Sequence, residues 1–198
     1  SWSRNSNPAM IRFADEEQGI LPGNNNKGTT LVSLLLKEAY AWDWNDYEFF
    51  DSKKGEIEDT SSPSSTRYVD LIEQGVGFES QIMTLDEAAP GDVMSIRYLS
   101  NWSGHTTMIH WVDWDAARAY PSDHPDADAD WAGFWYVPVE VMDSTDNPHS
   151  NDTREVNGEE LEGIGIGTMG VLINADYEVV GHTWSLPSSD YATKLDNW

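Results

Sequence analysis

The chain of 198 residues contains no cysteine, so it can form neither a disulfide framework nor a thiolate metal site. Basic residues are also scarce, because 11 Lys and Arg stand against 35 Asp and Glu, which gives a formal net charge of −24. Such a surface repels phosphates and anionic lipid, so no nucleic-acid partner is expected. It favours cationic partners, such as a basic immunity or inhibitor protein, or bound calcium, or a salty medium. Solubility alone explains the same charge equally well.

The third feature that the sequence lacks is a long apolar run. No stretch of 18 apolar residues occurs, so membrane insertion is not expected. Apolar residues nevertheless make up 39% of the chain and aromatic residues 12%, including ten Trp. A disordered chain would be poor in such residues. The length and composition therefore predict one folded domain over residues 1–198.

Hydrophobic spacing predicts helices in the first half of the chain. Residues 7–20 are typical of a short helix that begins with Pro8 in its first turn. Residues 28–40 carry leucines at helical spacing and predict a helix that is buried along one stripe. Residues 66–74 can form a third helix, ended by Gly75. The acidic, serine-rich segment 43–65 shows little periodicity and is expected to be a loop.

The second half of the chain alternates apolar and polar residues, as strands do. A turn at Pro90–Asp92 precedes the first candidate strand, and an acidic excursion at about 113–133 interrupts the series. The expected strands are 92–99, 104–112, 134–143, 168–175 and 178–185. Helices followed by strands predict an α+β fold in which N-terminal helices pack on an antiparallel sheet.

Three short motifs resemble those of a known enzyme superfamily. They are Lys27-Gly28-Thr29-Thr30-Leu31-Val32-Ser33 at the start of a helix, Pro90-Gly91-Asp92-Val93, and Ser103-Gly104-His105. Their order resembles the NlpC-type cell-wall hydrolases and their CHAP-like relatives, which are papain-like cysteine peptidases and amidases. The resemblance covers roughly residues 25–145 and continues more weakly to about residue 185.

The resemblance implies a site built on a thiol. In that superfamily a Cys begins the buried helix, a Gly-His pair supplies the base, and a polar residue on the next strand orients the histidine. A thiol at a helix N-terminus is biased towards thiolate, and the first N–H groups of the helix can receive an oxyanion. Aligning Leu31-Val32 with the family's Phe-Val places Gly28 where the Cys belongs. Glycine has no side chain with which to attack, so the chain as written cannot perform thiol chemistry.

The remaining members of the implied site are His105 and Asp143. Strand alternation places His105 on one face with Thr107, Ile109 and Trp111, and His110 on the other. A structural histidine is the competing interpretation of His105. Asp143 continues an apolar stripe of valines, where a carboxylate is costly unless it is paired. It either orients the histidine or caps the turn at residues 143–145.

Weaker candidates surround this set. Thr29 and Thr30 are hydroxyls near the helix start, but capping the helix suits them better than nucleophilic attack. His149 and Asp152 are reserve candidates for the rim of the site. Asp126, Asp128 and Asp130 alternate as in a calcium loop, yet Trp131 replaces the expected glycine, so a solvated acidic loop fits better.

Two other patterns bear on whether the chain binds a phosphate group or a zinc ion. Gly163, Gly165 and Gly167 precede a strand rather than a helix, which favours a close-packed or bulged start of a strand over a phosphate cradle. The histidines show neither HExxH spacing nor cysteine partners, so no zinc site is expected. The implied chemistry needs no cofactor.

The resemblance implies a secreted or periplasmic amidase or endopeptidase that acts on peptidoglycan stem peptides or another peptide. Here the site has lost its nucleophile, either naturally or through an introduced substitution. The alternative is a non-catalytic binding or surface protein of the same fold, in which the aromatics of 42–50 and 102–135 line a groove and calcium is bound.

Overall fold

The computed structural model describes residues 11–12, 23–24, 28–43, 47–59, 63–78, 81–98, 101–120, 133–156, 158–186 and 193–194. Their elements follow in the order β1 (Ile11–Arg12), β2 (Gly23–Asn24), α1 (Gly28–Tyr40), β3 (Glu48–Asp51), β4 (Glu56–Asp59), α2 (Ser65–Glu73), η2 (Leu85–Glu87), β5 (Val93–Tyr98), β6 (Ser103–Val112), η3 (Trp114–Ala116), β7 (Arg118–Ala119), β8 (Trp135–Thr145), β9 (Glu155–Val156), β10 (Glu159–Glu160), β11 (Gly163–Ile173), β12 (Val179–Thr183) and β13 (Thr193–Lys194). The labels η2 and η3 denote short 3-10 helices.

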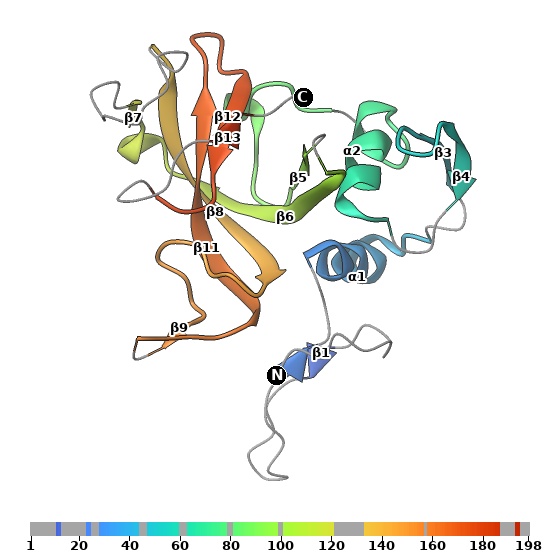
Figure 1. The fold of residues 1–198 in the computed structure, drawn as a ribbon, viewed down its shortest axis with the longest axis horizontal. Coiled ribbons are helices and arrows are strands. Elements are labelled where there is room, and N and C mark those ends of the chain that lie inside the picture. The colour runs from blue at the N-terminus through green and yellow to red at the C-terminus, as the bar shows by residue number, and fades with distance from the viewer. Residues whose placement is uncertain are drawn as a thin grey trace.

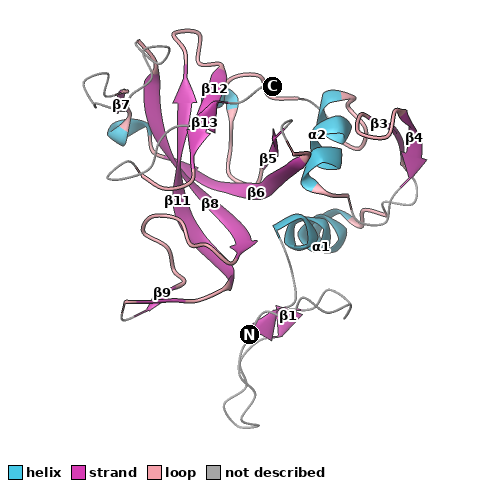
Figure 2. Ribbon diagram, in the orientation of Figure 1, coloured by secondary structure: helices cyan, strands magenta, loops and turns pink. Residues whose placement is uncertain are grey.

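A curled antiparallel sheet dominates the fold (Figures 1 and 2). Its strand order is β13-β12-β11-β8-β6-β5, and β7 pairs with the first two residues of β8. The longest strands, β8 and β11, run side by side in unbroken register from Thr145 opposite Gly163 to Trp135 opposite Ile173. β5 and β6 form a hairpin in which Ile96 lies opposite His105. This hairpin joins the sheet through the pairing of β6 with β8.

The main core lies on one face of this sheet. Alternation along β8 places Val137, Val139 and Val141 on that face, and all three are fully buried. They pack with Met94 and Ile96 of β5, Ile109 of β6, and Met169, Val171 and Ile173 of β11. Asp143 continues the same alternation and is equally buried. The core face therefore ends in a carboxylate.

The two helices pack against the β5–β6 side of the sheet (Figure 1). Val32 and Leu36 of α1 meet Tyr68 and Leu71 of α2 in a second apolar cluster. A buried hydrogen bond of 2.8 Å joins the hydroxyl groups of Ser33 and Tyr68. α1 ends at Tyr40, where Ala41 takes a positive φ of 53° that the helix cannot continue. The helices thus place the start of α1 against β6 and β8.

The predicted fold class was wrong. The chain is mostly β, with two α-helices in the described residues and a sheet curled into a half-barrel, rather than N-terminal helices packed on a papain-like sheet. The helix expected at 7–20 is not supported, since residues 11–12 of that range form strand β1, which pairs with β2. The expected loop at 43–65 contains a hairpin made of β3 and β4. Short, acidic strands of this kind carry too little alternation to be recognised from sequence.

Several single elements were predicted correctly. α1 has the predicted bounds and is buried along one stripe as predicted, with Leu31, Val32 and Leu36 buried and Leu34 and Leu35 half-buried. α2 ends at Glu73, just before Gly75, which takes a φ of 65°. The five expected strands match β5, β6, β8, β11 and β12, with β11 beginning earlier, at Gly163. Among the described residues, no helix is long and apolar enough to cross a bilayer.

Candidate active site

The site begins at the N-terminus of α1. Gly28 is its first residue and is buried. An ideal Cβ at position 28 would lie 3.3 Å from Cε1 and 3.6 Å from Nδ1 of the His105 ring, and 2.7 Å from the main-chain oxygen of Thr106. A side chain at this position would therefore touch the imidazole, but the Thr106 carbonyl would have to move by a few tenths of an ångström to admit it.

His105 is oriented by Asp143. Its Nε2 lies 2.7 Å from Oδ2 of Asp143, across neighbouring strands β6 and β8. Because an ionised carboxylate only accepts hydrogen bonds, Nε2 carries the proton of this contact. In a neutral ring Nδ1 is then unprotonated, and Nδ1 is the nitrogen that faces position 28. This is the orientation that a general base needs towards a nucleophile at the helix start.

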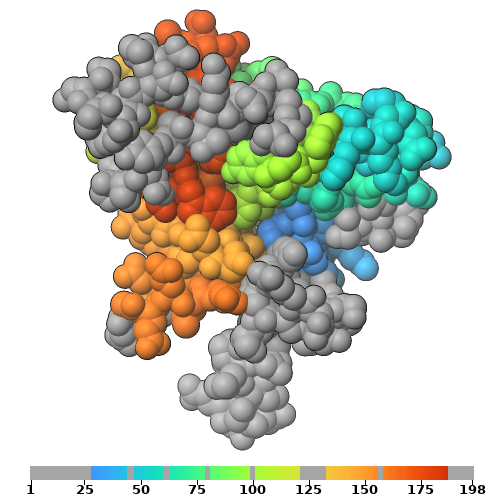
Figure 3. Space-filling view, in the orientation of Figure 1, coloured from blue at the N-terminus to red at the C-terminus, as the bar shows by residue number. Residues whose placement is uncertain are grey.

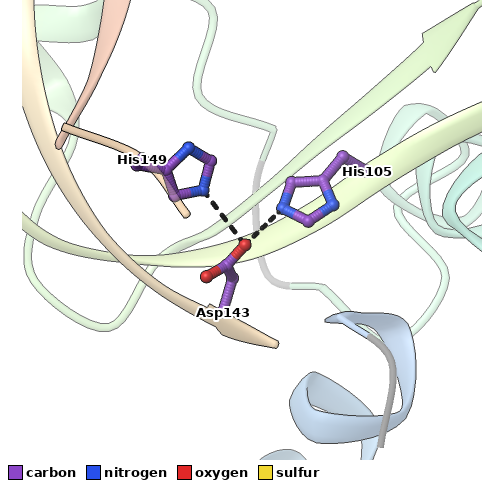
Figure 4. Close-up of side chains that lie close together, drawn as sticks. All are labelled: His105, Asp143 and His149. Carbon is purple, nitrogen blue, oxygen red and sulfur yellow. Dashed lines mark hydrogen bonds and ion pairs between the residues drawn. The ribbon is translucent and has the colours of Figure 1, made fainter. Parts of the chain in front are cut away.

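Asp143 is shared by two imidazoles. Its Oδ2 also lies 3.1 Å from Nε2 of His149, and Figure 4 shows both rings directing a nitrogen at the same oxygen. Burial alone would raise the pKa of Asp143, but the hydrogen bonds and charges of His105 and His149 outweigh it and hold this pKa well below its usual range. Asp143 is therefore ionised at neutral pH.

Arg154 supports Asp143 from the other side. Its Nη2 lies 2.9 Å from Asp143 Oδ1, as an ion pair rather than an aligned hydrogen bond, and 2.5 Å from Asp152 Oδ2. The guanidinium also donates to the main-chain oxygen of Gly163 at 2.9 Å. Asp152 accepts a further hydrogen bond from the main-chain N–H of His149. This network fixes the segment that carries His149 against the sheet.

The glycines of β11 make room for this segment. A Cβ on Gly165 would lie 2.5 Å from Nε of Arg154, and one on Gly167 would lie 2.8 Å from Cβ of His149. Both glycines are on the core face, opposite Asp143 and Val141. The prediction of a close-packed strand at these glycines was therefore correct, and the strand packs against the site itself.

Trp184 and His182 complete the surroundings. The Trp184 ring packs on His105 and His149, with centroid distances of 4.7 and 4.3 Å. Its indole N–H donates to the main-chain oxygen of Asn147. His182 accepts from or donates to the Tyr98 hydroxyl at 3.0 Å through Nε2. Burial, with the nearby His105 and His149, lowers the pKa of His182 to about 4, so this ring is neutral.

A cleft of about 520 Å³ opens beside Gly28 and His105. Its walls come from the start of α1, the segment at the start of α2, the start of β6 and the end of β8. In the space-filling view the blue surface of α1 lies beside the yellow-green surface of β6 and the orange surface of β8 (Figure 3). Its lining is rich in hydroxyl groups: Thr29, Ser64, Ser65, Thr66, Ser103, Ser144 and Thr145, with Trp102 and Asp146. Such a surface offers many donors and acceptors to a polar, extended ligand.

A metal ion is the other occupant to consider. In the described part of the chain, one atom each from His105, Asp143 and His149 forms a group of metal-binding type, within 4.8 Å of one another. The two nitrogen–oxygen separations are those of direct hydrogen bonds, and the adjacent Arg154 already supplies positive charge. Hydrogen bonding therefore accounts for the group without an ion.

The structure brings Gly28, His105 and Asp143 together. Thr29 lines the same cleft, and Thr30 is half-buried in the next position of α1. His110 lies apart, paired with Glu140 on the surface. A bulge in β6 at this point turns Val112 towards the core and leaves Trp111 exposed, contrary to the predicted alternation.

The structure places the other candidates differently from what was expected. His149 and Asp152 were expected at the rim, but both are buried at the centre of the network. Asp126, Asp128 and Asp130 lie outside the described residues. Of the expected groove aromatics, Trp42 is buried in the helix cluster, while Trp102 lines the cleft.

Sequence reasoning missed Arg154, His182 and Trp184. Arg154 had a usable signal: it is one of only 11 basic residues and follows Asp152 by two positions. His182 lies on β12, and Trp184 directly follows that strand. The resemblance is weak in this part of the chain and did not point to either residue. Their proximity to His105 arises only from the pairing of β12 with β11.

Comparisons with known proteins do not identify a family. No protein-family model matches the chain, and no solved structure matches it. The chain is similar to the uncharacterized protein R653 of Acanthamoeba polyphaga mimivirus, with 26% identity over 167 residues that cover 78% of this chain. The match spans 66% of that protein, just under two thirds of its length.

Proposed function

We propose that this chain carries the base half of a thiol-hydrolase site and that Gly28 stands at the nucleophile position. The observation that carries the proposal is the direction of the His105 ring. Nε2 is held by Asp143 while Nδ1 lies 3.6 Å from where a Cβ at position 28 would be. A catalytic imidazole needs this arrangement, in which one nitrogen is fixed and the other is free to take a proton.

The helix start and the cleft support the same chemistry. The first N–H groups of an α-helix have no partner within the helix, and the helix dipole favours negative charge there. A thiolate at position 28 would be stabilised by both effects, as would the oxyanion formed when it attacks an amide carbonyl. The cleft beside His105 can hold a peptide or an amino sugar. The amide bond of a peptidoglycan stem peptide is the substrate we propose.

A second candidate is a binding protein that uses the cleft without catalysis. The observation that favours it is the Thr106 carbonyl oxygen, which would lie only 2.7 Å from a Cβ at position 28. A chain in which glycine is the native residue would be expected to close around it in this way. Under both proposals, the protein as written does not turn over substrate through a thiol.

The test compares the protein with its Gly28→Cys variant on purified peptidoglycan. We expect no release of fragments from the Gly28 protein, and release that iodoacetamide blocks from Gly28→Cys. Gly28→Ala is the matched control, since it adds the same Cβ without a thiol. Failure of a folded Gly28→Cys variant to cleave, while the Gly28 protein retains binding to peptidoglycan, would favour the binding protein. Turnover by the Gly28 protein that Thr29→Ala abolishes would refute both.

A further inference from the structure

Both ring nitrogens of His149 face hydrogen-bond acceptors. Nδ1 lies 2.7 Å from the main-chain oxygen of Trp184, and Nε2 lies 3.1 Å from Oδ2 of Asp143. A carbonyl oxygen has no proton to give, and neither has an ionised carboxylate. Each nitrogen must therefore carry a proton, whereas a neutral imidazole carries only one. A neutral His149 would leave two lone pairs facing each other in a buried site.

The net charge of the buried network also favours a second proton on His149. Asp143, Asp152 and Arg154 are all nearly or fully buried, and they sum to one net negative charge. An uncompensated charge is costly away from water. One proton on His149 brings this cluster to neutrality.

The Trp184 ring beside His149 also favours a positive charge on the imidazole. The Trp184 ring lies with its centroid 4.3 Å from that of His149, at an interplanar angle of 38°. An indole face within about 6 Å attracts a positive charge. The Trp184 residue thus contacts His149 twice, through its ring and through its main-chain oxygen.

We propose that His149 is a buried imidazolium and the positioning residue of the site. It fixes Asp143 Oδ2, which in turn holds His105 with Nδ1 towards position 28. Its positioning role rests on the proposed function, but its protonation state does not. The titratable and charged groups that face it are Asp143 of β8, His105 of β6, His182 of β12, and Asp152 and Arg154 of its own segment.

A divalent metal between His149 and Asp143 is the competing arrangement. It would give the cluster one net positive charge next to Arg154, and it would replace a proton whose donor and acceptor already lie at hydrogen-bond distance. The protonated ring explains the contacts with fewer charges.

The experiment is a two-bond proton–nitrogen NMR spectrum of the ¹⁵N-histidine-labelled protein at about pH 7. We expect both nitrogens of His149 to be protonated, while His182 in the same spectrum shows one protonated and one bare nitrogen. A single proton on His149 would overturn the proposal. So would a tight, stoichiometric response of the His149 signals to added Zn²⁺ that a chelator reverses.

Variants test the coupling to Asp143 and His105. Asp143→Asn removes the negative charge, so His149 should lose one proton at the same pH. His149→Gln should weaken the preference of His105 for the Nε2–H form, read from the same spectrum. A His105 signature that His149→Gln leaves unchanged would refute the positioning role. None of these measurements uses a thiol. A negative result for His149 therefore leaves the proposed hydrolase site untouched, and an inactive Gly28→Cys variant leaves the protonation state of His149 untouched.

Discussion

Gly165 and Asp143 lie opposite each other on β11 and β8, and the absent side chain of Gly165 is where Arg154 passes to reach Asp143. A Cβ there would lie 2.5 Å from the Arg154 Nε. The repeat of glycines in β11 is therefore part of the site's construction. It lets a charged segment lie flat on the core face of a sheet.

Gly165→Ala should displace Arg154 and disturb the Asp143 network. Overpacking of this kind costs about 1–3 kcal/mol in the free energy of unfolding, which urea denaturation measures. Gly170→Ala is the matched control, because its Cβ would meet the Tyr136 ring on the other face of the same strand.

Both alanine variants should lose stability, but only Gly165→Ala should change the NMR signals of His105 and His149. Equal changes in the histidine signals of both variants would mean that the strand as a whole, and not the passage of Arg154, supports the site.

His182 should make stability depend on pH between about 6.5 and 4. Its pKa is lowered to about 4 in the folded state, mainly by burial, from an ordinary value of 6.5. Within this window the unfolded chain binds a proton that the folded chain excludes, so the free energy of unfolding falls as the pH falls, by up to about 1.4 kcal/mol per pH unit.

His182→Gln tests this pH window. Glutamine can still hydrogen-bond the Tyr98 hydroxyl but does not titrate, so the slope between pH 6.5 and 4 should flatten. The carboxyl of Asp143, whose pKa is also lowered, loses its contribution only below about pH 4, outside this window. An unchanged slope in urea melts of His182→Gln would contradict the prediction.

Arg97 should be a main link between α2 and the sheet. Its Nη1 lies 2.7 Å from Asp70 Oδ1, and both side chains are buried, at 9% and 3% exposure. Arg97→Met leaves the Asp70 charge without its partner and should cost about 3–5 kcal/mol. The Arg97→Met and Asp70→Asn double variant should lose less than the sum of the two single variants, because the stranded charge is gone. Additive losses in chemical denaturation would show that the pair is not coupled.

Local patterns allowed much of the fold to be predicted, but not its class. Helical spacing located α1, and alternation located the five long strands, because both signals are contained within single segments. The curl of the sheet depends on pairing between distant strands, which no local pattern records. The β3–β4 hairpin turns at Asp51, whose carboxylate accepts the main-chain N–H groups of Lys53 and Lys54, and at Gly55 with a φ of 75°. That turn chemistry was present in the sequence but lay within an acidic stretch.

The candidate site, like the fold, was predictable from sequence only in part. The proximity of Gly28, His105 and Asp143 was implied by the resemblance that the order of their motifs carries, while strand alternation separated His105 from His110. The roles of His149 and Arg154 were not, since they depend on how the segment after β8 folds back over the glycines of β11. Polar residues in a polar segment give no sign that they are buried.

The central claim is that position 28 lies where His105 and Asp143 can activate a nucleophile. The most direct measurement is the rate at which iodoacetamide alkylates Gly28→Cys at about pH 6. Glu38→Cys is the matched control, because it is exposed near the opposite end of the same helix, where the dipole disfavours a thiolate. Circular dichroism of Gly28→Ala shows whether the added Cβ is tolerated near the Thr106 carbonyl.

We expect Gly28→Cys to react at least about tenfold faster than Glu38→Cys, because a helix start and an imidazole together lower the pKa of a thiol. His105→Ala in the Gly28→Cys background should remove most of this advantage, and the surface variant His110→Ala should not. A folded Gly28→Cys protein that reacts no faster than Glu38→Cys would contradict the account.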